Sequence, residues 1–412
     1  MSHSGLPSAD DVATARRDLL GIAVETPVVT AGWLEDVVGK PVVLKLENLQ
    51  RTGSYKVRGA ATMMMRLSAD ERAAGVVAAS AGNHAQGVAL AAQRRSIPCS
   101  IVMPEGASWP KVMATRSFGA TVELHGRTFD EALEAARAIA AAQGAAFVPP
   151  FDHPDVICGQ ATVGAELLEQ HPEVDTLVVP VGGGGLIAGV AAAALHHQAA
   201  TGRRVRVVGV QAAGAAAFPA SLELGRPVRV EGIDTIADGI AVSQPGVLNL
   251  AIVAAHVDRI LTVDDASLAH AVMRLLENSK QVVEPAGAAG VAAILDGHLD
   301  DAGSLGVIVS GGNIDPMLLQ HIIVNELAHS DRYLSVAVEV RDRPGELSRI
   351  IQLVAQQGAN LVDIGHQRTP RGLPMGSAAV AITVETRGRA QQAGVLRALA
   401  SAGYDVADSA AT

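Results

Sequence analysis

The chain has 412 residues, of which 49% are hydrophobic but only 2% aromatic, and its formal net charge is −10. This length allows two or three domains around large aliphatic cores. The negative charge argues against nucleic acid and an anionic membrane surface as partners, and the two cysteines, Cys99 and Cys158, have neither the spacing of metal ligands nor the number for a disulfide framework.

The N-terminal segment MSHSGLPSADD lacks a basic region followed by an apolar one, so it is not predicted to be a secretory signal. No apolar run reaches the length of a membrane span without a polar interruption. We therefore expect a cytoplasmic protein with no membrane partner and no metal.

Short apolar runs alternate with alanine-rich helical stretches through most of the chain. Strands that alternate with helices are typical of an α/β fold with a parallel sheet, and continuous apolar runs suit strands buried on both faces. One helix is predicted over residues 130–144. The predicted strands are residues 42–46, 75–80, 100–104, 121–126, 176–181, 206–211 and 306–311.

The pattern changes near residue 330. LSVAVEV (334–340) alternates as a half-buried strand does, and Leu347, Ile350, Ile351 and Val354 then recur at the spacing of an amphipathic helix, which Gly358 closes. The strand LVDIGHQ, the turn TPRGLPMG, the strand SAAVAITVET, a helix over 389–402 and the strand YDVAD follow.

This order of elements, β-α-β-β-α-β, predicts a small antiparallel sheet covered by two helices. The polar segment AHSDR indicates a linker at 325–333. We therefore predict one domain over residues 1–328 and a second over residues 333–412.

Four glycines, Gly182 to Gly185, stand between a predicted strand and a helical stretch. Free backbone N–H groups and the helix dipole at such a position favour a phosphate, although a flexible loop is the alternative. The next strand ends at Gln211 rather than at an acid, which disfavours NAD, and no G-K-[ST] follows the glycines, which excludes a P-loop.

Two further polar loops, SAGNHAQG (80–87) and SGGNID (310–315), follow apolar strands. We expect all three loops at one carboxyl edge of a parallel sheet. The stretch ENLQRTGSYKVRGA (47–60) contains Lys56, which supplies an amine. The alternative is that Lys56 is an exposed surface lysine in a loop, as most lysines are. A phosphate cradle, polar tethers and a lysine together suit pyridoxal 5′-phosphate, with Lys56 holding its aldehyde as a Schiff base.

These motifs, with GGGGL and EPAGA (284–288), resemble the fold-type II pyridoxal-phosphate enzymes, specifically the threonine dehydratases, also called threonine ammonia-lyases. The resemblance runs from residue 26 to about residue 316 and implies two open, mostly parallel α/β subdomains, as in the β subunit of tryptophan synthase. The segment with DRPGELS and QGAN resembles an ACT regulatory domain, which implies a ferredoxin-like βαββαβ fold.

The resemblance also implies roles for single residues. Lys56 binds the cofactor and later moves the α-proton, Tyr55 lies beside the ring, Ser310 faces the pyridine nitrogen, and Glu284 lies near the ring edge. Asn83 contacts the pyridoxal hydroxyl. The phosphate is expected on Gly182, Gly183, Gly184, Gly185 and Leu186, the substrate carboxylate on Ser80, Ala81, Gly82, Asn83 and His84, and an effector near Gly345 and Asn360.

The implied activity is β-elimination of L-threonine to 2-oxobutanoate and ammonia, with L-serine to pyruvate as a secondary activity. An amino-acid effector, isoleucine or valine, and a homodimer or homotetramer are expected. One alternative is an isomerase similar to serine racemase, but such enzymes have a serine where this chain has Ala81, and acids for a metal where it has QAAGAAAFPA. The other alternative, a non-enzymatic amino-acid sensor, is disfavoured because Lys56 and every cofactor loop are present.

Overall fold

The computed structural model describes residues 5–329, 331–368 and 374–408. The chain divides into two compact units, unit 1 over residues 1–315 and unit 2 over residues 316–412. The predicted linker at 325–333 stays a prediction; helix α14 (Pro316–His329) enters it, and Ser330 lies outside the described residues. Residues 1–4 of the N-terminal segment and residues 369–373 of the predicted TPRGLPMG turn also lie outside them.

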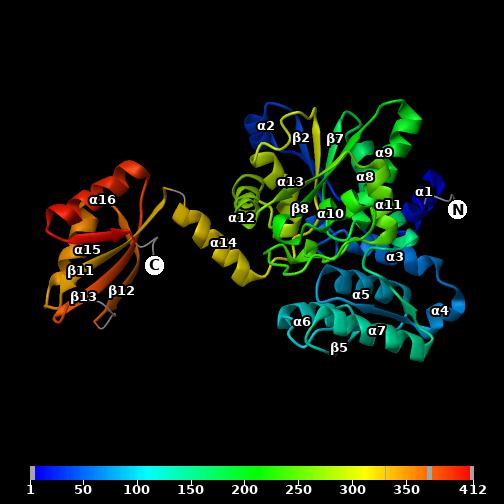
Figure 1. Cartoon of the computed structure of the whole chain (residues 1–412), viewed down its shortest axis with the longest axis horizontal. Helices are drawn as coiled ribbons and strands as arrows, with labels where there is room; N and C mark the ends of the chain where they lie inside the picture. The colour runs from blue at the N-terminus through cyan, green and yellow to red at the C-terminus, as the bar shows by residue number, and fades with distance from the viewer. Residues whose placement is uncertain (1–4, 330, 369–373, 409–412) are drawn as a thin grey trace. The chain divides into compact units, whose positions relative to one another are not determined.

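The larger sheet of unit 1 has six strands in the order β1-β2-β10-β7-β8-β9. Only β1 runs antiparallel to its neighbour. Helices α8 and α9 pack on one face through the core that contains Leu177 and Val179, and α13 covers the other face (Figure 1). The strands are β1 (Val28–Thr30), β2 (Val42–Leu46), β7 (Thr176–Pro180), β8 (Arg206–Ala212), β9 (Arg259–Val263) and β10 (Leu305–Val309).

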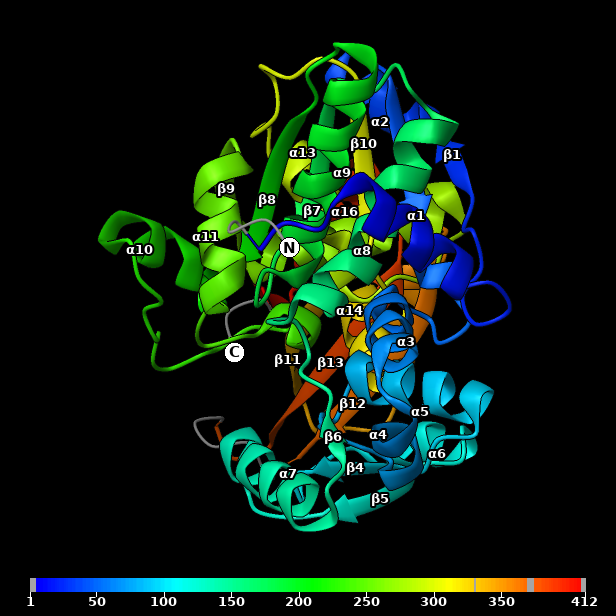
Figure 2. The same ribbon diagram turned by 90° about the vertical axis from the view of Figure 1, so that its right-hand side faces the viewer.

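The smaller sheet of unit 1 has four parallel strands in the order β5-β4-β3-β6 (Figure 2). On β3, Val76 and Ala78 enter the core beneath α3 and α5, whereas Val77 and Ala79 pack against α7. Both faces are thus covered, which explains the continuous apolar run. The strands are β3 (Val76–Ala79), β4 (Cys99–Met103), β5 (Thr121–Leu124) and β6 (Ala146–Phe147).

Predicted and observed strands of unit 1 agree except at the edges of the sheets. Each of the seven predicted strands overlaps an observed one, whereas β1, β6 and β9 are not predicted. All three are edge strands, and β1 and β6 have only three and two residues. An edge strand is paired on one side only, so it does not need the long apolar run that marks a central strand.

The predicted helix over 130–144 is α7 (Phe129–Gln143). Thr128 and Glu131 form a capping box at its start, and Gly144 ends it with a φ of 67°. The other helices of unit 1 are α1 (Ala9–Asp18), α2 (Gly32–Val38), α3 (Lys56–Arg66), α4 (Ala69–Ala74), α5 (Asn83–Arg95), α6 (Trp109–Ser117), α8 (Pro154–Gln170), α9 (Gly185–Thr201), α10 (Ala217–Leu224), α11 (Val247–His256), α12 (Asp265–Arg274) and α13 (Pro285–Leu295).

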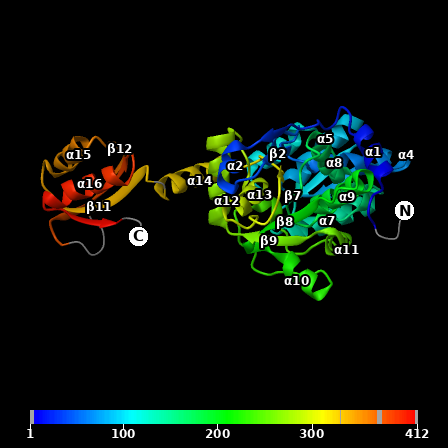
Figure 3. The same cartoon turned by 90° about the horizontal axis from the view of Figure 1, so that it is seen from above.

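Unit 2 contains a four-stranded antiparallel sheet in the order β12-β13-β11-β14, and α15 and α16 lie on one side of it (Figure 3). This is the predicted ferredoxin-like βαββαβ arrangement. Ile350 and Val354 are buried as expected, but Ile351 is exposed, so the apolar stripe of α15 is narrower than predicted. The elements are β11 (Tyr333–Arg341), α15 (Glu346–Gln356), β12 (Asn360–Gln367), β13 (Ser377–Glu385), α16 (Arg389–Ser401) and β14 (Asp405–Asp408).

None of the helices in the described parts of the chain combines the length and apolar character needed to cross a bilayer.

Candidate functional site

The glycine loop lies between β7 and α9, as predicted. Gly184 adopts a φ of +97°, and no side chain caps the first turn of α9. A Cβ atom on Gly183 would lie 2.5 Å from the ring of Phe151, and one on Gly184 would lie 2.6 Å from Phe218. A side chain at either of these two positions would clash, and the uncapped N-terminus of a 17-residue helix suits an anion.

Two residues that were not predicted contact this loop, and a third, Asp152, holds the start of the helix that carries one of them. The amide of Asn249 donates a 2.9 Å hydrogen bond to the carbonyl of Gly183, and the ring of Phe151 packs against the glycines. Asp152 accepts hydrogen bonds from the backbone of Val247 and of the following residue, at the start of α11. No sequence motif marks these residues, because they are far from the loop along the chain.

Lys56 and the glycine loop line the same cavity, together with Tyr55 and Phe151. Lys56 begins α3, and its Nζ lies 3.4 Å from the Tyr55 hydroxyl and 5.2 Å from the centre of the Tyr55 ring. Leu186, the last residue predicted to hold the phosphate, also lines this cavity. An amine and an anion-binding helix terminus are therefore available to one small molecule.

The SGGNID loop is joined to the chain just before Lys56 by backbone hydrogen bonds. The N–H of Tyr55 donates to the carbonyl of Ser310 over 3.2 Å, and the N–H of Gly312 donates to the carbonyl of Gly53 over 2.9 Å. Ser310 itself is buried. These bonds fix the position of Ser310 relative to the start of α3.

Asn83 is buried in a chain of three polar side chains. Its amide donates a 2.7 Å hydrogen bond to the Glu284 carboxylate, and its oxygen accepts one of 2.7 Å from Asn313. Burial, with the negative charge of Asp238, raises the pKa of Glu284 to about 7, although the Asn83 hydrogen bond and Lys56 oppose this rise. Asn313 lies in the predicted SGGNID loop but has no predicted role.

The predicted carboxylate-binding loop, Ser80 to His84, leads from β3 into α5. The hydroxyl of Ser80 accepts a 3.1 Å hydrogen bond from the N–H of Gly82, and Ala81 packs at the edge of the core. A ring nitrogen of His84 lies 2.9 Å from the carbonyl of Val148. Burial and the nearby Lys56 lower the pKa of His84 to about 4, so this imidazole is neutral at neutral pH.

One part of the site prediction is wrong. The loops were expected at the edge of a single sheet, but the glycine and SGGNID loops follow strands of the larger sheet, whereas SAGNHAQG follows β3 of the smaller one. The two sheets meet at the site because α3 and α5 pack against each other. Apolar runs identify strands but do not tell which sheet each strand joins.

The two predicted effector-binding residues lie in unit 2. Gly345 precedes α15 with a φ of +98°, and Asn360 begins β12, where its amide lies 3.4 Å from Glu385. Their role stays a prediction.

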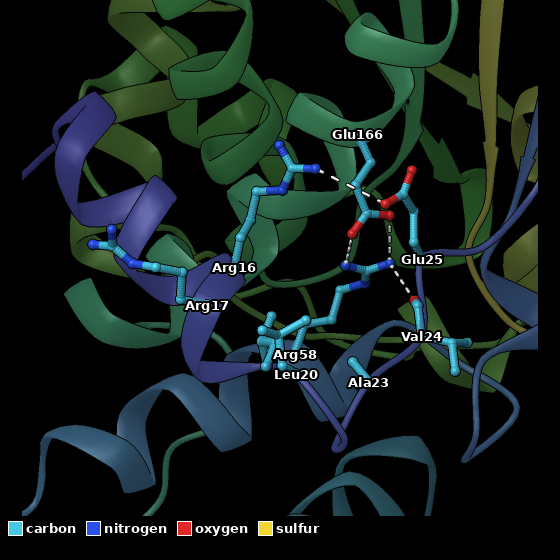
Figure 4. Close-up of a pocket in the computed structure, with 9 residues that line it drawn as sticks. Arg16, Arg17, Leu20, Ala23, Val24, Glu25, Arg58 and Glu166 are labelled. Atoms are coloured by element: carbon cyan, nitrogen blue, oxygen red, sulfur yellow. Dashed lines mark hydrogen bonds and ion pairs between the residues drawn. The ribbon is translucent and has the colours of Figure 1, made fainter.

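A second cavity, of about 240 Å³, lies in unit 1 beside α1 (Figure 4). It is lined by Arg16 and Arg17 of α1, by the chain before β1, and by Arg58 and Glu166. Lys56 is not among its lining residues.

In the part of the chain that the structure describes, no three His, Cys, Asp or Glu side chains are grouped so that they could hold a metal ion.

Comparison with known proteins reveals consistent similarities. Residues 20–311 match the family model described as pyridoxal-phosphate dependent enzyme. The chain is 45% identical over 398 residues to an L-threonine ammonia-lyase of Thermotoga maritima. The aligned part is 96% of this chain and 98% of that protein. The match therefore extends into unit 2.

Two solved structures are similar to this chain over more than three quarters of its length. A maize serine racemase is 34% identical, with a TM-score of 0.72 over 78% of this chain and 98% of the other. The processed form of threonine deaminase isoform 2 from Solanum lycopersicum is 36% identical, with a TM-score of 0.71 over 79% of this chain and 90% of the other.

Proposed function

This chain belongs to the family of pyridoxal-phosphate dependent enzymes, and from that premise we propose that it catalyses the β-elimination of L-threonine to 2-oxobutanoate and ammonia. The corresponding reaction of L-serine, which gives pyruvate, is proposed as a secondary activity. The relative from Thermotoga maritima carries the name of this activity and matches nearly the whole chain.

The observation that carries the proposal is the cavity shared by Lys56 and the uncapped start of α9. The cofactor has an aldehyde and a phosphate, so one group suits the amine and the other suits the N–H groups of Gly182 to Leu186. When bound, pyridoxal phosphate supplies an electron sink that makes the Cα proton of an attached amino acid acidic. The amine of Lys56 is then the base that removes this proton.

Polar residues of the SAGNHAQG and SGGNID loops have proposed roles in the same reaction. The hydroxyl of Ser310 would hold the pyridine nitrogen of the bound cofactor, and because it is neutral it could not keep that nitrogen protonated as a carboxylate would. This favours prompt loss of the β-hydroxyl over transamination. Asn83 is the side chain proposed for the pyridoxal hydroxyl, and its bonds to Glu284 and Asn313 hold it in place. The N–H groups of Ser80 to His84 are proposed for the substrate carboxylate.

The likeness to serine racemase supports a second candidate, an isomerase of serine. Racemisation requires a proton donor on the face of Cα opposite the lysine. A serine hydroxyl in the SAGNHAQG loop could supply it. This chain has Ala81 there, whose methyl group has no exchangeable proton. Elimination is therefore the favoured outcome.

Unit 2 is proposed as an ACT regulatory domain. Its βαββαβ order and antiparallel sheet support this assignment, and isoleucine or valine bound near Gly345 and Asn360 is the proposed effector. Feedback by either amino acid would suit a cytoplasmic enzyme of isoleucine biosynthesis that acts as a homodimer or homotetramer. A sensor without catalytic activity is disfavoured, because it would not need Lys56 in the cavity.

The experiment that tests the function uses the purified protein loaded with pyridoxal phosphate. We expect a visible absorbance band of lysine-bound cofactor, and 2-oxobutanoate with ammonia from L-threonine. Lys56→Ala should lose both, whereas the control Lys280→Asn, at an exposed lysine with a positive φ, should keep both. Normal ammonia release by Lys56→Ala would refute the assignment of the lysine. A loaded wild-type enzyme that does not turn over threonine would refute the substrate.

A further inference from the structure

Four charged side chains form a buried cluster behind the site, which we call the ion cluster: Lys45, Glu47, Arg58 and Glu166. Lys45 and Glu47 are fully buried, Arg58 is 1% exposed, and Glu166 is 5% exposed. Two positive and two negative charges balance each other. Charges removed from water are very unfavourable unless partners satisfy them, so this cluster depends on close geometry.

The guanidinium of Arg58 is the centre of the ion cluster. Its Nε and Nη2 donate to the carboxylate of Glu47 over 2.9 and 2.8 Å, and its Nη1 and Nη2 donate to that of Glu166 over 2.6 and 2.8 Å. Thr162 and the carbonyl of Val24 each accept a further bond of 3.1 Å. Figure 4 shows the guanidinium facing Glu166 and Val24. Every one of the five N–H donors of arginine can therefore be satisfied.

The ion cluster joins three elements that support Lys56. Glu47 follows β2, Glu166 belongs to α8, and Arg58 lies in the first turn of α3, two residues after Lys56. Residues two apart on a helix point to nearly opposite sides, since each residue turns the helix by about 100°. The side chain of Lys56 lines the cavity, so Arg58 anchors the same helical turn from the other side.

Close backbone contacts hold this turn as well. A Cβ on Gly87 of α5 would lie 2.9 Å from the backbone nitrogen of Val57, and one on Gly159 of α8 would lie 2.5 Å from the carbonyl oxygen of Arg58. Helix α8 also contacts α9 closely, because a Cβ on Gly189 would lie 2.6 Å from the backbone nitrogen of Ala161. Helix α8 therefore supports both α3, which carries Lys56, and α9, which follows the glycine loop.

We propose that Arg58 is a positioning residue, which fixes the first turn of α3 against α8 through Glu47 and Glu166 and so sets the place of the Lys56 amine relative to the glycine loop. The inference rests on the proposed function, in which the amine and the loop bind two ends of one cofactor. Arg58 does not line the cavity that contains Lys56, so it acts through the backbone of α3.

The other explanation is that Arg58 only stabilises the fold, and the chain contains a matched control for it. Arg66, at the end of the same helix, forms an ion pair with Asp155, at the start of α8. Both pairs therefore join α3 to α8, but only Arg58 lies beside Lys56. The Arg66 pair is the more exposed one, so both variants are compared at temperatures at which each is fully folded. If Arg58 only stabilised the fold, cofactor affinity and kcat would then stay close to the wild-type values in both variants.

The experiment compares Arg58→Lys with Arg66→Lys in the full-length protein. Lysine keeps the charge but cannot form the two-pronged contacts of a guanidinium. Each cofactor-free protein is titrated with pyridoxal phosphate below its melting temperature, and the visible band of lysine-bound cofactor gives the affinity. Turnover of L-threonine at saturating cofactor then gives kcat and KM. Melting temperatures are measured in parallel.

We expect Arg58→Lys to bind the cofactor at least tenfold more weakly and to lose about 10²-fold in kcat, because misplacement of a reacting group by about 1 Å can cost that much. Arg66→Lys should stay within twofold of the wild type in both. Wild-type affinity and kcat in folded Arg58→Lys would overturn the proposal, as would equal losses in the two variants.

Thr162→Val keeps the proposal testable if Arg58→Lys does not fold. Valine removes one acceptor of the Arg58 guanidinium without changing the charges of the ion cluster. We expect cofactor affinity to fall severalfold, and an unchanged affinity would overturn the proposal. Failure of the proposed function is recognised separately, because the wild type would then show no lysine-bound cofactor or no turnover of threonine.

Discussion

Replacement of Glu284 by glutamine should change how the stability of unit 1 depends on pH. Burial raises the pKa of this carboxyl from an ordinary value of 4.5 to about 7. The native state therefore binds the proton more tightly than the unfolded chain does, and stability is lost as pH rises from the unfolded pKa to the folded one. Glutamine cannot ionise, yet its oxygen can accept the same hydrogen bond from Asn83.

The size of the effect follows from the difference between the two pKa values. Each pKa unit is worth about 1.4 kcal/mol, so the ionised carboxylate weakens the folded state by about 3 kcal/mol above pH 7. The variant should be more stable than the wild type by about 1 kcal/mol at pH 5 and by about 3 kcal/mol at pH 8. Below pH 4.5 the two proteins should have nearly the same free energy of unfolding.

Urea unfolding of the cofactor-free protein between pH 4.5 and 8 measures this difference. Tryptophan fluorescence reports on unit 1 alone, because both tryptophans of the chain, Trp33 and Trp109, lie there. The control Glu123→Gln removes an exposed carboxylate of β5 and should stay within about 0.5 kcal/mol of the wild type. A stability difference for Glu284→Gln that does not grow with pH would refute the argument from burial.

Three further predictions concern other parts of the molecule. Ala81→Ser should raise the yield of D-serine from L-serine without abolishing ammonia release, as measured by chiral chromatography; substantial D-serine from the unmodified enzyme would contradict this reading of the loop. Gly183→Ala should weaken cofactor binding about tenfold or more, because its Cβ would lie 2.5 Å from the ring of Phe151, whereas Gly32→Ala, where the space is open, should bind normally. Removal of residues 316–412 should leave turnover in place but abolish any response to isoleucine or valine, and an intact protein whose kinetics neither amino acid shifts would refute the regulatory role.

The sequence by itself determined the fold class and the chemical groups of the site. Central strands must be apolar on both faces, so β7 and β10 are visible as nearly continuous apolar runs. The loops that follow them carry glycines and polar residues whose spacing has a chemical meaning, as at Lys56 and Gly182 to Gly185. Short-range patterns of this kind are present in the chain before it folds.

Contacts between distant segments were decided only by the tertiary structure. The sequence shows that Asn83 and Glu284 belong to polar loops, but not that they share a hydrogen bond across 201 residues of chain. Phe151 and Asn249 reach the glycine loop in the same way, and no local pattern distinguishes them from other residues. Such contacts depend on how helices and sheets pack, which side-chain periodicity does not specify.

Lys45 illustrates this limit most clearly. In VVLKL it interrupts an apolar strand, and a lysine is almost never fully buried unless it is paired. In the folded chain it is fully buried, because its amine donates a 2.7 Å hydrogen bond to Glu166, 121 residues away, and another to the carbonyl of Thr26. Only the packing of α8 against β2 and α3 brings these partners together, and without them the charge could not leave water.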